Sequence, residues 1–143
     1  MMPDKKREGN GWASSLPLTS NECFWFNDTP KITALKKSKF RSKFKLTAKD
    51  RDYKATKGLE TIKDHACQFI NFRIAPAFPK NDGKQTPMKG HPVFIAQHAT
   101  GTCCRRCLEK WYRIEKGRLL SNDEIKFVVK LVVGWILEQD GQR

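Results

Sequence analysis

The strongest hydrophobic pattern in the chain lies near its C-terminus. Apolar residues recur there at the spacing of one face of a helix. The preceding segment SNDE (residues 121–124) has the serine and the glutamate of a capping box. The β-branched residues would also suit a strand, but the cap and the spacing favour a helix. Its buried face should carry Ile125, Val128, Val129, Val132, Trp135 and Ile136.

Three more helices are predicted in the middle of the chain. Thr47 and Asp50 have the spacing of a capping box, and Gly58 suits the end of the short helix that they begin. The segment LETIKDHACQFINFRI then places apolar residues on one helical face, and Pro76 closes it. Pro92 suits the first position of a helix over VFIAQHA, which ATGT ends.

The cysteine-rich segment CCRRCLEKWYRI (residues 103–114) predicts a further helix. One face would be basic, with Arg106, Lys110 and Arg113, and the other apolar, with Cys104, Cys107, Leu108, Trp111 and Ile114. Residues 75–92 hold four of the seven prolines and should form a long loop, whereas residues 1–30 show no regular spacing. We therefore expect a mainly α protein: a single small helical domain of about five helices with a basic, partly extended N-terminal arm.

The positive charge of the chain is concentrated in one segment. The formal net charge is +13, and residues 31–57 hold eleven basic residues against two acidic ones. Such a segment attracts a polyanion, of which nucleic acid is the obvious one, while an acidic protein partner is an alternative. The phenylalanines of KKSKFRSKFK (residues 36–45) could stack on bases or pack into the domain. We expect binding of DNA or RNA through Lys36, Lys37, Lys39, Arg41, Lys43 and Lys45, joined by Arg105, Arg106, Lys110 and Arg113.

The sequence does not indicate a membrane protein. The longest apolar stretch, FVVKLVVGWIL (residues 127–137), contains a lysine and is shorter than the roughly 20 residues of a membrane-spanning helix. The N-terminal charges are not followed by the apolar segment of a secretion signal. Three of the five cysteines lie within five positions, which suits free thiols better than disulfide pairs. We therefore expect a cytoplasmic protein with no membrane partner.

One long segment carries a resemblance to a known family. It reads NDGKQTPMKGHPVFIAQHATGTCCRRCLEKWYRIEKGR, with SKFRSKFKL before it and a capped helix ending in WI after it. Over about residues 35–138 the chain resembles DUF4186, a bacterial domain of unknown function. The resemblance implies an N-terminal extension (residues 1–34) and a helical domain (residues 35–143), and it supplies no activity. The family has a histidine after the tryptophan of KW, where this chain has Tyr112, so a scheme that needs that side chain as a base or ligand loses support.

Zinc is the most specific interpretation of the cysteine segment. Cys104 and Cys107 have the Cys-x-x-Cys spacing of two zinc ligands, and Cys103 and His98 are the nearest further candidates. The second ligand pair of a usual structural site is missing, and the alternative is that the cysteines are small core residues. We expect no cofactor, and zinc is the exception to test. Cys103 and Cys104 also precede two arginines at a helix start, which would lower a thiol pKa.

The loop before the cysteines supports a second alternative function. Asp82 and Lys84 match the end of an Asp/Glu-x-Lys element that binds Mg²⁺ in nucleases, although Asn81-Asp82-Gly83 most simply makes a turn. The alternative is an enzyme acting on nucleic acid or nucleotides, with its site where residues 81–98 meet the cysteine helix. Its candidate catalytic residues are Asp82, Lys84, His91 and His98.

Overall fold

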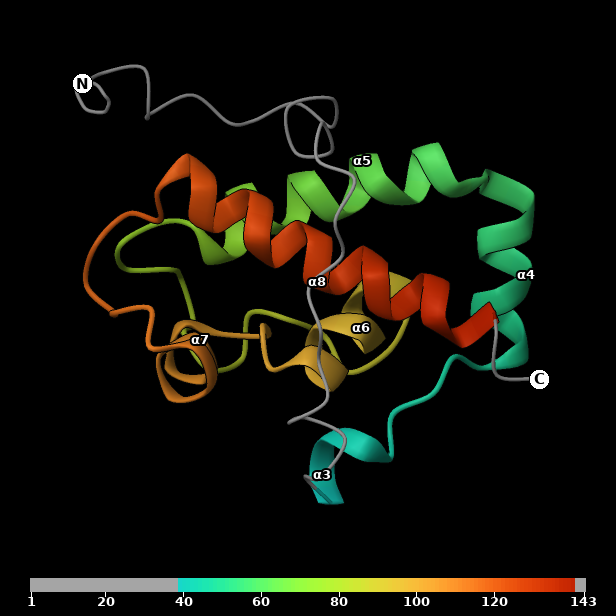
Figure 1. The fold of residues 1–143 in the computed structure, drawn as a ribbon, viewed down its shortest axis with the longest axis horizontal. Coiled ribbons are helices and arrows are strands. Elements are labelled where there is room, and N and C mark those ends of the chain that lie inside the picture. The colour runs from blue at the N-terminus through green and yellow to red at the C-terminus, as the bar shows by residue number, and fades with distance from the viewer. Residues whose placement is uncertain (1–38, 141–143) are drawn as a thin grey trace.

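The structure, a computed structural model, describes the backbone of residues 39–140 and the side chains of residues 41–139 (Figure 1). Its elements are α3 (Lys39–Ser42), α4 (Ala48–Lys57), α5 (Leu59–Phe69), the π-helical turn η2 (Ile70–Ile74), α6 (Pro92–Thr100), α7 (Arg105–Tyr112) and α8 (Asn122–Asp140). Five of these helices have eight residues or more, and the described part contains no strand. The prediction of a small, mainly α domain is confirmed. The predicted arm, with Lys36, Lys37 and the side chain of Lys39, lies outside the described residues.

The long helix α8 packs across α6 and α5 and forms the centre of the core (Figure 1). All six residues of its predicted apolar face are buried, and these are Ile125, Val128, Val129, Val132, Trp135 and Ile136. Its predicted capping box is present, because the Ser121 N–H donates to Glu124 Oε1 over 2.9 Å and the Glu124 N–H donates to Ser121 Oγ over 3.1 Å. Local sequence signals therefore place this helix correctly.

Helices α4 and α5 meet at a corner formed by one glycine (Figure 1). Thr47 and Asp50 form the predicted capping box at the start of α4, with hydrogen bonds of 3.0 Å and 3.2 Å. Gly58 has φ of +86°, which a residue with a side chain rarely adopts, and so it both ends α4 and precedes α5. The predicted amphipathic helix after it is present, but its last turn, η2, is π-helical, which the pattern did not indicate.

Helix α6 is buried on every side, from Pro92 to Thr100. It begins at Pro92, as predicted, and ends at Gly101 in the left-handed conformation. Its polar residues are hydrogen-bonded inside the domain: the Thr100 hydroxyl donates to the Ala96 carbonyl over 2.8 Å, and the Gln97 amide donates to the Thr102 carbonyl over 3.3 Å. Residues 75–91 form the predicted loop between η2 and α6.

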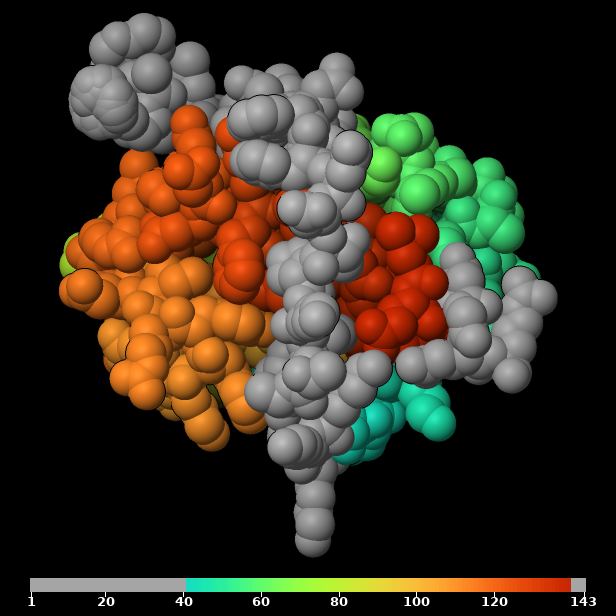
Figure 2. Space-filling view, viewed as in Figure 1, coloured from blue at the N-terminus to red at the C-terminus, as the bar shows by residue number. Residues whose placement is uncertain are grey.

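Helix α7 begins at Arg105, two residues later than the sequence predicted, so Cys103 and Cys104 lie in the link before it. Leu108 is fully buried and Trp111 is half-buried on the predicted apolar face. On the side shown in Figure 2 the described surface is formed mainly by α7, α8 and their link, with α4 and α5 at its edge. No helix within residues 39–140 has the length and the apolar character needed to cross a membrane.

Candidate functional site

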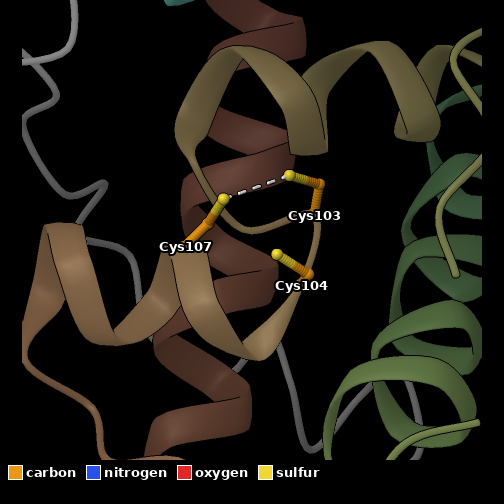
Figure 3. A group of neighbouring side chains, drawn as sticks. All are labelled: Cys103, Cys104 and Cys107. Atoms are coloured by element: carbon orange, nitrogen blue, oxygen red, sulfur yellow. Dashed lines mark hydrogen bonds between the residues drawn. The ribbon is translucent and has the colours of Figure 1, made fainter. Parts of the chain in front are cut away.

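Three cysteines converge where α6 gives way to α7. Cys103 and Cys104 come from the link after α6, and Cys107 comes from the first turn of α7. Their three Sγ atoms all lie within 4.8 Å of one another, and the Cys103 thiol donates to Cys107 Sγ over 3.6 Å (Figure 3). Cys103 and Cys104 are buried, and Cys107 is half-buried. These three residues, which we call the cysteine cluster, could hold a metal ion.

Arg41 of α3 closes one side of the cysteine cluster. Its side chain donates to the His98 carbonyl over 2.6 Å, to Cys107 Sγ over 3.1 Å and to Cys103 Sγ over 3.7 Å. It is only 9% exposed. Unlike most of the other predicted nucleic-acid contacts, Arg41 is buried, and its guanidinium faces the sulfur atoms.

The environment of the cluster raises the pKa of all three thiols. For Cys103 the hydrogen bond with Cys104 and burial raise the pKa, against the hydrogen bond with Cys107 and the cation of Arg41, which lower it. For Cys107 the hydrogen bond with Cys103 and burial raise the pKa, and the hydrogen bond with Cys104 opposes them. The hydrogen bond with Cys103 lowers the pKa of Cys104, but the hydrogen bond with Cys107 and burial outweigh it. The lowered thiol pKa that the sequence suggested is therefore wrong for the cluster without a metal.

The ring of His98 lies apart from the cysteine cluster. Its Nε2 is 3.1 Å from the Pro87 carbonyl oxygen and 3.3 Å from that of Thr86, so this nitrogen carries a proton and donates. Phe44 stacks on the ring with centroids 5.6 Å apart. Burial lowers the pKa of His98. Of the four predicted metal ligands, the structure brings together the three cysteines and leaves His98 as a packing and hydrogen-bonding residue.

His91 is the N-cap of α6 and one half of a histidine pair. Its Nδ1 accepts from the Val93 N–H over 3.0 Å, so the proton of the neutral ring is on Nε2, which donates to Nδ1 of His65 over 2.9 Å. Tyr53, Phe69 and Phe94 surround the ring. Burial, followed by the neighbouring His65, lowers the pKa of His91 to about 4. Sequence reasoning missed His65, since only the fold brings it to His91.

Asp82 and Lys84 lie in a turn with a structural role. Asp82 Oδ1 accepts from the Arg105 N–H over 3.2 Å and from the Gln85 amide over 2.9 Å, so it binds the first N–H of α7 from a distant part of the chain. The Lys84 side chain is exposed. The side chains of Asp82, His91 and His98 thus have separate partners, and none of their described hydrogen bonds joins two of the four predicted catalytic residues.

Arg105 is completely buried and binds main-chain carbonyls. Its guanidinium donates over 2.8 Å to Pro76, over 2.7 Å to Glu115 and over 3.4 Å to Ile74 and Ala75. Burial lowers its pKa, and the cation of Arg118 adds to this effect. Arg105, which the sequence grouped with the nucleic-acid contacts, therefore has its guanidinium inside the domain and bound to the main chain.

The remaining predicted cations within the described side chains are exposed, and they are Lys43, Lys45, Arg106, Lys110 and Arg113. Helix α4 adds three further exposed cations of the predicted basic segment, residues 31–57, and these are Lys49, Arg51 and Lys57. A cavity of about 640 Å³ lies between the starts of α4 and α6, with Lys49, Tyr53 and Lys89 among its lining residues. Sequence reasoning missed this cavity because Lys89 is brought to α4 only by the fold.

The geometry defines a small helical domain with a largely buried three-cysteine cluster and with exposed cations along residues 43–57. The chain belongs to the DUF4186 family, a domain of unknown function, which matches residues 29–137. No solved structure matches the chain. This match confirms the resemblance seen in the sequence, and the family has no assigned activity.

Proposed function

We propose that this protein binds nucleic acid in the cytoplasm through the exposed cations of residues 43–57. The observation that carries the proposal is the density of exposed positive charge on this segment, which we call the basic edge. It presents Lys43, Lys45, Lys49, Arg51 and Lys57. Cations at such density neutralise successive phosphates and release their counterions.

The basic edge is held against the domain by inward-facing neighbours. Arg41 and Leu46 are buried and Phe44 is half-buried, whereas Lys43 and Lys45 between them are exposed. From there the chain follows the lower edge of the domain in Figure 1 to α4. The cations are therefore carried by a fixed backbone, which lowers the entropic cost of placing several of them on one ligand.

Acidic side chains offset little of this charge. Asp50 is buried and occupied by the capping box with Thr47, which leaves Asp52 as the exposed acid between residues 43 and 57. Tyr53 and the cavity beside it offer an aromatic ring next to Lys49 and Lys89, an arrangement suited to a base and its phosphate. We propose no reaction, because Asp82, His91 and His98 are engaged in hydrogen bonds that hold the fold together.

The test is the salt dependence of binding to labelled single-stranded DNA, duplex DNA and single-stranded RNA, followed by fluorescence anisotropy from 50 to 300 mM NaCl. We expect affinity to fall steeply as NaCl is added. In a plot of the logarithm of the binding constant against the logarithm of the NaCl concentration, the slope should become shallower by about 0.7–0.9 for each phosphate contact removed. The triple variant Lys43→Gln, Lys45→Gln, Lys49→Gln should weaken binding and reduce the slope by about 2–3.

A matched variant distinguishes binding through the basic edge from binding that depends only on the net charge of the protein. Lys80, Lys84 and Lys116 are also exposed, and their replacement by glutamine removes the same charge elsewhere. This variant should keep most of the affinity. Equal losses in the two triple variants, or affinity that does not change with salt, would overturn the proposal. Binding to none of the three nucleic acids would do the same.

A further inference from the structure

We propose that Cys103, Cys104 and Cys107 form a zinc site in which three thiolates bind the ion and Arg41 balances the charge. The fourth coordination position is open and takes water or a small ligand from solution, on the side where Cys107 is half-buried. The three cysteines and Arg41 all lie in the part of the chain that the structure describes, and the zinc site does not depend on nucleic-acid binding.

The spacing of the sulfur atoms suits zinc. A tetrahedral ion with metal–sulfur bonds of about 2.3 Å holds its sulfur ligands about 3.8 Å apart. The three Sγ atoms already lie within 4.8 Å of one another, and Cys103 and Cys107 are 3.6 Å apart. Their side chains point toward a common centre between the link and the first turn of α7 (Figure 3). Small rotations of these side chains would therefore complete the three-sulfur set.

The charges also balance around this centre. Zn²⁺ with three thiolates carries a net charge of −1, and the Arg41 guanidinium supplies +1. Arg41 already donates to Cys107 Sγ over 3.1 Å and approaches Cys103 Sγ at 3.7 Å. N–H groups that bind the ligand atoms of a metal fix their orientation and raise its affinity. A buried arginine that contacts two of the three sulfur atoms thus fits an anionic metal–thiolate centre better than three neutral thiols.

Binding is an exchange of protons for the ion and involves no electron transfer. Each thiol releases its proton to solvent as a zinc–sulfur bond forms, so three protons leave for one ion bound. A disulfide accounts for the cluster less well than a metal ion does, because a bond between any two of the cysteines would leave the third outside it. The sulfur atoms of Cys103 and Cys107 are also well beyond the roughly 2.05 Å of a disulfide bond.

The test uses the full-length protein without an affinity tag, reconstituted with zinc and, separately, with cobalt. We expect one equivalent of zinc by elemental analysis, and a cobalt complex whose thiolate charge-transfer absorption falls in Cys103→Ser and Cys107→Ser. Arg41→Gln should bind zinc about 10–100-fold more weakly in chelator competition. Cys67→Ser is the control, because Cys67 is also a buried cysteine but lies outside the cluster. It should bind zinc as the unaltered chain does.

Two further measurements keep the proposal testable if a variant fails to fold. In the unaltered chain, zinc should protect three thiols from alkylation, and peptide mapping should assign them to Cys103, Cys104 and Cys107. Cys23→Ser should bind zinc normally, since the proposal leaves the fourth position to solvent. Less than a tenth of an equivalent of zinc, equal loss in Cys67→Ser, or loss in Cys23→Ser would overturn it.

Discussion

The two adjacent arginines of the CCRRC segment lie in opposite environments. Arg105 is fully buried among main-chain carbonyls, whereas Arg106 is exposed. Arg105→Met should lower the free energy of unfolding by roughly 3–5 kcal/mol, because buried and partly buried main-chain carbonyls would lose a donor at about 1–3 kcal/mol each. Urea unfolding followed by circular dichroism measures this change.

Arg106→Met is the matched control for that measurement. It removes the same charge one position along α7, and we expect a change of less than about 0.5 kcal/mol. Similar losses in the two variants would contradict the buried role of Arg105. The helical spacing placed Arg106 on the basic face of the predicted helix, but it did not show where the side chain of Arg105 would lie. Arg105 faces inward because α7 begins at that residue and turns its side chain toward Pro76 and Glu115.

Gly101 is required at the end of α6 for two reasons. Its φ is +73°, and a Cβ atom built on it would lie 2.8 Å from Cδ1 of Trp111. Gly101→Ala should therefore cost about 1–2 kcal/mol for the left-handed backbone and about 1–3 kcal/mol for the overlap with Trp111. Thermal unfolding should show the loss.

Gly117→Ala isolates the backbone part of this cost. Gly117 has φ of +85°, but nothing lies within 4 Å of the position of its added Cβ. This variant should lose only about 1–2 kcal/mol. If Gly101→Ala is no less stable than Gly117→Ala, the close contact with Trp111 does not constrain the fold.

At the scale of elements, the local signals in the sequence were sufficient for most helices. Both capping boxes, the glycine corner at Gly58 and the proline at the start of α6 act within a few residues, so their patterns can be identified without a structure. The connections between elements could not be predicted in this way. Thr86, for example, binds the Cys103 carbonyl over 2.8 Å, and no local pattern marks that contact.

Helix α6 gives the domain a dependence on pH through its N-cap. The pKa of His91 is lowered to about 4 in the folded chain, from about 6.5 when unfolded, by burial and by the nearby His65, with Asp50 opposing them. The unfolded chain therefore binds a proton more readily between these values. The stability that neutral His91 contributes is fully present above about pH 6.5 and is lost as the pH falls toward 4. This loss amounts to roughly 3 kcal/mol at most.

His91→Asn tests this dependence. Asparagine is a good N-cap that can still accept from the Val93 N–H, but it does not titrate. The variant should lose less stability than the unaltered chain when urea unfolding is repeated at pH 7, 6 and 5. An unchanged slope of stability against pH would mean that His91 does not carry the effect. The absolute stability of the variant does not enter the comparison.

At the scale of the whole molecule, the sequence identified the cysteines as a group, but it did not show which distant residues lie next to them. The three cysteines could be grouped from their spacing alone, because they lie within five positions. Arg41 could not be assigned to them, since it is 62 residues from Cys103 and resembles the other cations of its segment. In the fold, Arg41 therefore contacts the cysteine cluster, whereas its neighbours Lys43 and Lys45 are exposed and belong to the basic edge.

The net charge of +13 should make stability and nucleic-acid binding respond to salt in opposite directions. Self-repulsion destabilises a compact state of high net charge, and salt screens it within about 10 Å or less above 0.1 M. Raising NaCl from 50 to 500 mM should raise Tm by about 3 °C, corresponding to about 1 kcal/mol. The same salt should weaken nucleic-acid binding by counterion competition.

The triple glutamine variant of Lys43, Lys45 and Lys49 provides the internal comparison. It carries three fewer positive charges, so its Tm should start higher at low salt and rise less as NaCl is added. Differential scanning calorimetry without nucleic acid measures both quantities. A Tm that falls with NaCl would show that attractive ion pairs, such as the 2.7 Å pair of Arg118 and Glu124, outweigh the repulsion among the cations. In that case the excess positive charge would cost the fold little stability. Added NaCl would then weaken nucleic-acid binding without stabilising the protein.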